Sequence, residues 1–442
     1  MEYIDKFKKV AVLGAAGKMG SGILLLTAME MAELKLQNKN LNAVLYAIDV
    51  SADGLAGLLK YIESQVIRAA EKKTVMLRNL YADREDLIEN GDVISQYAKD
   101  VLAMVRTSSH LSDAYGSSLV FEAIKEDPKL KVTILKDIDL NSDEKPWFFT
   151  NTSSIPIGEL NEDAELKGRV IGFHFYNPPA VQRLVELIPS DQTLPDLIEF
   201  AKTYAKKLRK VLIPSNDFAG FIGNGHFMRD ALYGIEEVEK LKDEMGFANA
   251  VWVINKLSQE FLIRPMGIFQ LIDYVGIDVV SYIMGVMNPY LDKEDLHSQL
   301  LEDLLSKGIS GGQFSNGSQK DGFFKYERGR PSAIYDIQTG DYVSLDEADK
   351  AAGEFLGSLP ESFNWKQVNF SPKKNELLED FFKGLREMDT NGARMAKAYG
   401  LNSKAIGELL VNSKVAATEE DVNKVLVTGF YHAYGPINNY FN

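Results

Sequence analysis

The stretch Lys9–Leu36 reads KVAVLGAAGKMGSGILLLTAMEMAELKL and decides the fold of the N-terminal half. A short apolar run ends at Leu13, three glycines follow at G-x-x-G-x-x-G spacing, and an apolar-periodic segment begins at Ser21. Glycines let the backbone turn sharply and approach a pyrophosphate, and the first amides of the next helix can bind its oxygens. The stretch therefore predicts a strand, a phosphate-binding turn and a helix of an α/β fold.

A second short strand is predicted at Ala43–Ile48 and ends at Asp49. An acidic side chain there can accept hydrogen bonds from an adenosine ribose, and because no arginine follows closely, NAD is favoured over NADP. Two irregularities accompany the motif. The tighter G-x-G-x-x-G frame would put Ala15 at its first position, and Asp49 comes later than the usual ~20 residues after the glycines. A longer helix or an added loop around Leu36–Asn40 would account for the second, and a nucleotide-free α/β turn remains the alternative.

Two further segments place polar side chains where predicted strands end. Trp147–Thr150 reads as a strand that delivers Asn151–Ser154, and Val170–Phe173 reads as a strand that delivers His174. In a doubly wound parallel sheet, ligands lie at the carboxyl ends of the strands. Both segments are therefore expected to face the cofactor crevice.

His174 suggests catalysis, because imidazole is the side chain that accepts and returns a proton near neutral pH. Glu186 follows twelve residues later, past a di-proline turn that cannot continue a helix. The chain can fold back there and bring the carboxylate beside the imidazole, where it would fix the tautomer. The alternative is a satisfied core histidine within an aromatic run.

The composition sets outer limits on function. A chain of 442 residues with 45% hydrophobic and 25% charged residues is typical of a soluble protein with two or three domains. It has no cysteine, which excludes disulfides, thiolate catalysis and cysteine-ligated metals, and we expect a cytoplasmic protein. The net charge of -14 works against binding to nucleic acid or to anionic membranes. The apolar run Ile23–Ala28 is far too short to span a bilayer.

Seven motifs follow one another in order from the N-terminus to about Tyr326. They are Gly17-x-x-Gly20-Ser21-Gly22-Ile23, Glu122-Ala123-Ile124, Asn151-Thr152-Ser153-Ser154, His174-Phe175-Tyr176-Asn177-Pro178, Leu184-Val185-Glu186, the run from Asp217 to Asn224 and the run from Pro265 to Gly276. As an ordered set they resemble the L-3-hydroxyacyl-CoA dehydrogenases. The resemblance implies a Rossmann-like doubly wound sheet followed by one or more all-α C-terminal domains, with the active site between the sheet domain and the first helical domain.

The resemblance also implies roles for the catalytic residues. His174 would take the proton of the substrate 3-hydroxyl while hydride passes from C3 to the nicotinamide, and Glu186 would orient the imidazole. Ser153 and Asn224 match polar residues that hold the reacting oxygen or the thioester carbonyl. From the residues alone, a strand-end turn for Ser153 and a helix cap or internal helix bond for Asn224 stay open.

The resemblance places a further set of residues near the two ligands. The expected NAD contacts are Gly14, Ala15, Ala16, Gly17, Lys18, Met19, Gly20, Asp49, Glu126, Lys131 and Ser153. For coenzyme A, Lys72 matches the family's cation, and Ser64 or Gln65 stands near the place of its serine. An exposed helical lysine that is merely solvated is the alternative for Lys72. The segment Gly317–Phe324 departs from the family, which usually has a lysine before the first glycine.

Three domains are expected: 1–214 binds NAD, 215–340 is helical and completes the active site, and 341–442 is a second, degenerate helical module. The turn-rich stretch Gly308–Tyr342 predicts a long loop. The last module echoes the helix pattern around Arg264–Phe269, which indicates a duplication. The protein would then be a homodimer, or a monomer with an internal pseudo-dimer of helical modules.

Two histidines outside the motifs are assigned to packing. His226 has no metal partners at ligand spacing, and His432 lies in a C-terminal loop, so no metal site is expected.

The sequence thus predicts an NAD-dependent 3-hydroxyacyl-CoA dehydrogenase of fatty acid metabolism and beta-oxidation, with an acyl-CoA substrate. Three other functions stay open. The same fold could act on a free hydroxy acid, in which case loss of Lys72 would leave activity unaffected. The chain could be a multienzyme component that binds partners through 404–442, or a non-catalytic NAD sensor.

Overall fold

The computed structural model of the chain describes residues 2–314, 317–360 and 363–442. The chain divides into two compact units, Met1–Asp217 and Phe218–Asn442. The boundary lies three residues after Pro214, where the NAD-binding domain was predicted to end. The division of the second unit into two modules stays a prediction.

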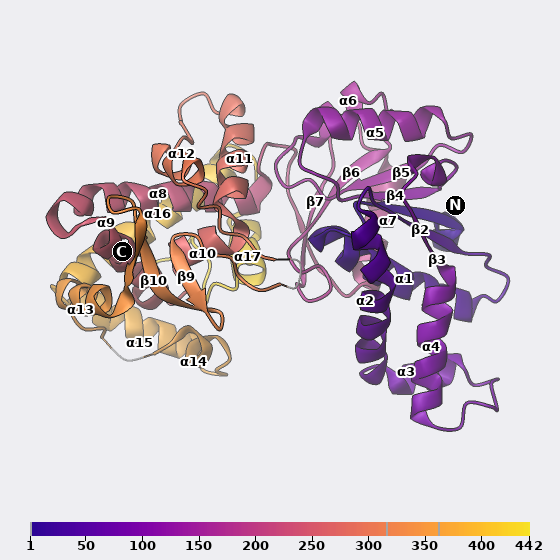
Figure 1. The fold of residues 1–442 in the computed structure, drawn as a ribbon, viewed down its shortest axis with the longest axis horizontal. Helices are drawn as coiled ribbons and strands as arrows, with labels where there is room; N and C mark the ends of the chain where they lie inside the picture. The colour runs from indigo at the N-terminus through magenta and orange to yellow at the C-terminus, as the bar shows by residue number, and fades with distance from the viewer. Residues whose placement is uncertain (1, 315–316, 361–362) are drawn as a thin grey trace. The chain divides into compact units, whose positions relative to one another are not determined.

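The first unit is built on an eight-stranded sheet with the order β3-β2-β1-β4-β5-β6-β7-β8, coloured indigo to magenta in Figure 1. The strands are β1 Lys9–Leu13, β2 Val44–Ile48, β3 Val105–Ser108, β4 Leu119–Glu122, β5 Trp147–Thr150, β6 Val170–Phe175, β7 Leu184–Ile188 and β8 Val211–Pro214. All neighbouring pairs are parallel except β6 and β7. The order of the first six strands is that of doubly wound dinucleotide-binding sheets, which confirms the predicted fold class.

The helices of the first unit connect these strands. They are α1 Lys18–Gln37, α2 Ala52–Glu71, α3 Thr74–Leu80, α4 Asn90–Met104, α5 Pro128–Leu140, α6 Ile157–Asp163 and α7 Pro195–Lys207, with 3-10 turns η1 Tyr3–Phe7 and η2 Leu111–Ala114. The 20 residues of α1 account for the long separation between the glycines and Asp49. Figure 1 shows α2 and α4, which are in contact, extending away from the sheet with α3 at their far end.

The amphipathic pattern of α2 determines which of its side chains reach solvent. Leu58, Ile62, Val66 and Ala70 form a buried stripe at every fourth position. The opposite face, which carries Ser64, is exposed.

The region between α2 and β4 differs from the sequence prediction. Helices α3 and α4 lie there, and strand β3 follows α4 directly, although none of the sequence patterns described above indicates a strand at that point. The strand is missed because it forms the edge of the sheet, where Arg106 and Thr107 are exposed and the alternation of a half-buried strand is absent.

The second unit is mainly helical. Its helices are α8 Phe221–Met245, α9 Phe247–Lys256, α10 Ile268–Val275, α11 Ile277–Met287, α12 Gln299–Ser306, α13 Leu345–Leu356, α14 Trp365–Asn369, α15 Lys374–Glu387, α16 Asn391–Asn412 and α17 Glu419–Gly429, with a π-helical turn η3 Leu257–Phe261 and a 3-10 turn η4 Asn288–Tyr290. One large apolar core is shared by residues from α8 to the C-terminal segment.

A three-stranded antiparallel sheet in this unit corrects the prediction of a long loop at Gly308–Tyr342. Its strands are β9 Phe324–Glu327, β10 Arg330–Asp336 and β11 Asp341–Ser344. The turn between β9 and β10 consists of Arg328 and Gly329, both with positive φ, which suits a tight hairpin although Arg-Gly is a weaker signal than Asn-Gly. Two residues of the predicted loop, 315 and 316, lie outside the described residues. The second unit is therefore helical with a small added sheet, rather than all-α.

A buried polar cluster joins α8 to α16 within the second unit. Arg264 donates to the Asp230 carboxylate at 2.6 Å, and it also reaches the Ser403 hydroxyl at 3.4 Å. The His226 Nε2 lies 3.2 Å from both the carbonyl and the hydroxyl oxygen of Ser403. Burial lowers the pKa of His226 to about 4, so the imidazole stays neutral, and its contacts agree with the packing role expected for it.

Among the described residues, no helix on its own is long and apolar enough to cross a bilayer. The bent pair Ile268–Val275 and Ile277–Tyr290 reaches that length and composition only when the two helices are taken together.

Candidate active site

The antiparallel pairing of β6 with β7 brings His174 and Glu186 together. The two residues are direct partners in the strand register, and the His174 Nδ1 lies 3.3 Å from the Glu186 Oε1. Glu186 is fully buried, whereas His174 is 8% exposed. Because the carboxylate faces Nδ1, proton exchange with a substrate would use Nε2. The chain reversal predicted at the two prolines is the connection between these strands.

Tyr176 contacts the same pair and was not singled out from the sequence. Its hydroxyl donates to the Glu186 Oε1 at 2.7 Å, and its ring lies 4.9 Å from the His174 imidazole, centroid to centroid. Burial, together with the neighbouring Glu186 carboxylate, raises the pKa of Tyr176 well above its usual value. The available signal was its spacing of two residues from His174, because alternate residues of a strand share a face.

The loop Asn151–Ser154 follows β5 and is held by Glu126. The Glu126 Oε1 accepts hydrogen bonds from the Ser153 amide at 2.8 Å, from the Thr152 hydroxyl at 2.6 Å and from the Ser154 hydroxyl at 3.0 Å. One carboxylate oxygen thus fixes three consecutive residues of the loop. The position of Ser153 therefore depends on Glu126.

Lys131 connects Glu126 to a second carboxylate, Glu122. The Lys131 Nζ lies 2.6 Å from the Glu122 Oε1 and 3.1 Å from the Glu126 Oε2, and the side chain is 1% exposed. Burial would lower the pKa of Lys131, but the two carboxylates raise it above its usual value. Burial would likewise raise the pKa of Glu126, but Lys131 and the donors of the loop hold it below its usual value. Both residues thus belong to the support of the Ser153 loop, and their expected contact with NAD stays a prediction.

Two glycines of the turn between β1 and α1 have no room for a side chain. Gly14 has a φ of +71°, and a Cβ there would lie 2.3 Å from the Ala123 carbonyl oxygen. A Cβ on Gly20 would lie 1.9 Å from the Gly14 carbonyl oxygen. The helix begins after Gly17 with no side-chain cap, so the amides of its first turn are not covered by a capping side chain. This bare turn at a helix N-terminus fits the pyrophosphate of a dinucleotide.

Asp49 lies directly after β2 and beside the glycine turn. Its carboxylate accepts hydrogen bonds from the Ala16 amide and from the Ser51 amide, both at 2.9 Å. The two bonds hold an acceptor group beside the turn, as recognition of ribose hydroxyls requires. The remaining predicted contacts, Ala15, Lys18 and Met19, lie in the turn and in the first turn of α1. These residues fit NAD.

The residues predicted to bind coenzyme A lie on the exposed side of α2. Ser64 is exposed and donates to the Tyr61 carbonyl oxygen at 2.8 Å, and Lys72 is exposed at the C-cap of the helix. Arg68 lies between them at a spacing of four residues and is also exposed. The three side chains therefore form one stripe. Arg68 was overlooked, although the i, i+4 spacing from Ser64 and Lys72 was readable in the sequence.

Asn224 lies in the first turn of α8, in the second unit.

His432, also in the second unit, is buried, and burial lowers its pKa well below the usual value, as expected for a packing residue. Among the described residues, no group of three or more His, Asp or Glu side chains is arranged to hold a metal ion.

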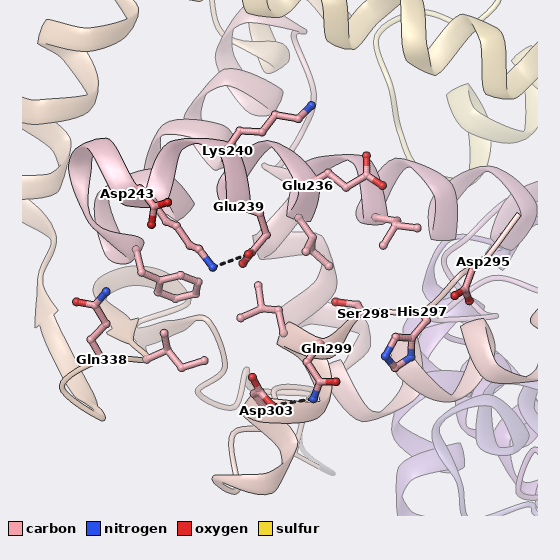
Figure 2. A pocket seen from close by; sticks show the side chains of 16 residues that line it. Glu236, Glu239, Lys240, Asp243, Asp295, His297, Ser298, Gln299, Asp303 and Gln338 are labelled. Carbon is pink, nitrogen blue, oxygen red and sulfur yellow. Dashed lines mark hydrogen bonds and ion pairs between the residues drawn. The ribbon is translucent and has the colours of Figure 1, made fainter.

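A hollow of about 790 Å³ in the second unit has the wrong charge for either predicted ligand (Figure 2). Its carboxylates outnumber its ammonium groups: Glu236, Glu239, Asp243, Asp295 and Asp303 stand against Lys240 and Lys242. Phosphates of NAD or coenzyme A would be repelled by this surplus. None of the predicted site residues is among the described residues that line it.

Comparison with known proteins identifies the family. The family model described as "3-hydroxyacyl-CoA dehydrogenase, NAD binding domain" matches residues 9–218, and the one described as "3-hydroxyacyl-CoA dehydrogenase, C-terminal domain" matches residues 249–326. Together the two matches span more than half of the chain.

Two curated relatives match this chain over similar lengths but differ in how much of their own length the match covers. The human mitochondrial hydroxyacyl-coenzyme A dehydrogenase is 29% identical over 324 residues, which cover 72% of this chain and 91% of the human protein. The alpha subunit of the fatty acid oxidation complex of Vibrio parahaemolyticus is also 29% identical over 70% of this chain, but the match covers 39% of that longer subunit.

A solved structure shares the fold over nearly the full length. The 3-hydroxybutyryl-CoA dehydrogenase of Escherichia coli matches with a TM-score of 0.62 and 18% identity, over 97% of this chain and 90% of that one. Fold likeness thus extends beyond the matched family regions into the C-terminal segment. On the two family models and the ordered motifs, the chain belongs to the 3-hydroxyacyl-CoA dehydrogenase family of NAD-dependent oxidoreductases.

Proposed function

We propose that this chain oxidises an L-3-hydroxyacyl-CoA to the 3-ketoacyl-CoA, and catalyses the reverse reduction, with His174 as the general base and acid. The observation that supports the proposal most directly is the cross-strand pair of His174 with Glu186 at the end of β6. Family membership supplies the reaction class, and the pair supplies the proton chemistry.

In the oxidation, His174 accepts the proton of the substrate 3-hydroxyl at Nε2. The Glu186 carboxylate accepts a hydrogen bond from Nδ1–H, which keeps Nε2 unprotonated and ready to act as a base. After transfer, the same carboxylate stabilises the imidazolium. NAD, when bound, supplies the acceptor for the hydride that leaves C3. In the reverse direction, Nε2 returns the proton to the 3-keto oxygen.

Ser153 and Asn224 are proposed to hold the reacting oxygen or the thioester carbonyl. The Ser153 amide is bonded to Glu126, so this serine presents its side chain from a fixed loop. A hydroxyl and an amide that are already oriented stabilise developing negative charge without reorganising.

The glycine turn and Asp49 are proposed to bind NAD, and the stripe Ser64, Arg68 and Lys72 to bind the phosphates of coenzyme A. Two cations on one exposed helix face provide the local positive charge that a protein of net charge -14 needs to attract a polyanionic ligand. The substrate is therefore proposed to be the thioester rather than the free acid.

A direct test follows NADH consumption by absorbance with acetoacetyl-CoA, in parallel with free acetoacetate and with NADPH. Rapid consumption that requires both NADH and the thioester is the expected result. Consumption of NADH with free acetoacetate but not with acetoacetyl-CoA would indicate a dehydrogenase of free hydroxy acids on the same fold. NADH binding with no turnover of either substrate would identify a cofactor sensor.

A further inference from the structure

We propose that Tyr176 is a positioning residue that sets the proton affinity of the His174–Glu186 pair. The inference rests on the proposed function, because it requires His174 to be the proton acceptor. It goes further by assigning a role to a residue of the His174–Pro178 motif for which the resemblance implies none.

The geometry gives Glu186 two donors on one oxygen. The Tyr176 hydroxyl lies 2.7 Å from Oε1, and the His174 Nδ1 lies 3.3 Å from the same atom. His174 pairs directly with Glu186 across the strands, and Tyr176, two residues further along, reaches it diagonally. The tyrosine contact is the shorter of the two.

The tyrosine remains a donor at any pH at which the enzyme works. Burial and the adjacent Glu186 carboxylate raise the pKa of Tyr176 well above its usual value. A protonated hydroxyl donates and carries no charge, so it draws charge density from Oε1 without neutralising the carboxylate.

Sharing that oxygen weakens its interaction with the imidazole. When Tyr176 donates, Oε1 offers less stabilisation to a proton on His174, so the pair releases its proton at a lower pH. Without the hydroxyl, Oε1 faces Nδ1 with one donor fewer, and the pair holds its proton more tightly. The effect is therefore on the pH at which the base becomes available, in addition to its orientation.

The elements that adjoin β6 and β7 carry further charged groups. Glu126 and Lys131 support the loop after β5, and Arg183 is exposed in the connection between β6 and β7. Lys210, just before β8, donates from Nζ to the Pro179 and Gln182 carbonyl oxygens, and burial lowers its pKa to about 8. A Tyr176→Phe substitution changes none of these residues, so a change in the pH profile would report on the lost hydroxyl.

The test is the pH dependence of kcat/KM for the oxidation of 3-hydroxybutyryl-CoA by NAD, measured on full-length wild type and Tyr176→Phe. The midpoint of the acid limb is expected to move to higher pH by a few tenths to about one unit in the variant. Tyr3→Phe is the matched control, because Tyr3 donates to Glu30 at 3.2 Å in the same unit, away from any histidine. That control should leave the midpoint unchanged.

A double substitution separates this role from simple packing. In a Glu186→Gln background the carboxylate is gone, so Tyr176→Phe should no longer move the midpoint. If Tyr176→Phe folds poorly, Tyr176→Met, which also lacks a donor, carries the same expectation. An unchanged midpoint in the foldable variant, or a shift to lower pH, would overturn the inference.

Failure of the proposed function gives a different result. An active His174→Gln enzyme would show that His174 is not the base, whatever Tyr176 does. An inactive His174→Gln enzyme combined with an unmoved Tyr176→Phe profile would leave the dyad standing and remove only the role of Tyr176.

Discussion

Two buried histidines, one in each unit, have opposite surroundings. His174 faces the Glu186 carboxylate, whereas His226 lies against the Ser403 carbonyl and hydroxyl in a cluster that contains Arg264. Burial holds His226 in its neutral form. The Asp230 carboxylate favours protonation and the Arg264 guanidinium opposes it, but burial is the largest influence on the pKa. Burial alone therefore does not make a histidine a base. A carboxylate in direct contact with a ring nitrogen is what distinguishes the candidate catalytic residue, because the direct partner of His226 is Ser403.

The largest expected effect comes from exchanging the two histidines separately for glutamine. His174→Gln should lower kcat by about 10²- to 10⁴-fold, because the proton acceptor is lost, while NADH still binds. His226→Gln should leave kcat within about twofold, because the polar contacts of His226 are with Ser403 and not with a residue of the proposed active site. Steady-state kinetics and NADH fluorescence titration measure both. An equal decrease of kcat in the two variants would contradict the assignment of His174 alone as the catalytic base.

Lys131→Met should give the next largest effect, on stability. It leaves the buried Glu122 and the partly buried Glu126 carboxylates without their cation, and breaking a buried ion pair typically lowers the free energy of unfolding by about 3–5 kcal/mol. Urea denaturation would measure the loss in the free energy of unfolding. Lys136→Met is the control, because its ion pair with Glu165 is exposed and should contribute little. A Lys131 variant as stable as this control would contradict the support role of the network.

The pH dependence of stability should report the burial of His226. Its pKa in the folded state is about 4, below the ordinary value of 6.5. The unfolded chain therefore binds the proton first as the pH falls, so stability is present above about pH 6.5 and is lost between about pH 6.5 and 4, by up to roughly 3 kcal/mol. The difference in unfolding free energy between wild type and His226→Gln, followed across this window, isolates that contribution. A difference that is flat with pH would show that His226 titrates normally.

The smallest expected effect is on thioester binding by an exposed cation. Lys72→Ala should raise KM for acetoacetyl-CoA by about two- to fivefold with little change in kcat, because exposed ion pairs are weak and screened by salt. Lys202→Ala, on the exposed side of α7, serves as the control. An unchanged KM in the Lys72 variant at low salt would favour the free hydroxy acid as substrate.

Much of the first unit could be predicted because its signals are local. The strand, glycine turn and helix around Gly14–Gly20 lie within one continuous stretch, and Asp49 follows the next strand. The approach of Glu186 to His174 was also predictable, since a di-proline turn separates two apolar runs. The hydroxyl of Tyr176 was not, because its target depends on the register of two antiparallel strands rather than on neighbouring residues.

The missed elements share a different cause. The edge strand β3 lacks the alternation of a half-buried strand. In the hairpin β9–β10 the short strand Phe324–Glu327 does alternate, but the turn at Arg328 and Gly329 does not carry a common turn pair. Glu126 and Lys131 were predicted beside the cofactor, but their mutual contacts could not be foreseen. Such contacts depend on which long side chains meet beneath a loop, and sequence spacing does not determine that.

Asp217, the last residue of the first unit, determines where a fragment that contains only this unit should end. Its carboxylate accepts hydrogen bonds from the Ile157 and Gly158 amides, at the beginning of the helix that follows the Ser153 loop. A fragment cut at Pro214 would contain every strand of the sheet and still lack this acceptor. Anyone who wishes to produce the nucleotide-binding half by itself should therefore end it after Asp217, or the helix nearest to the serine loop will begin with two unsatisfied amides.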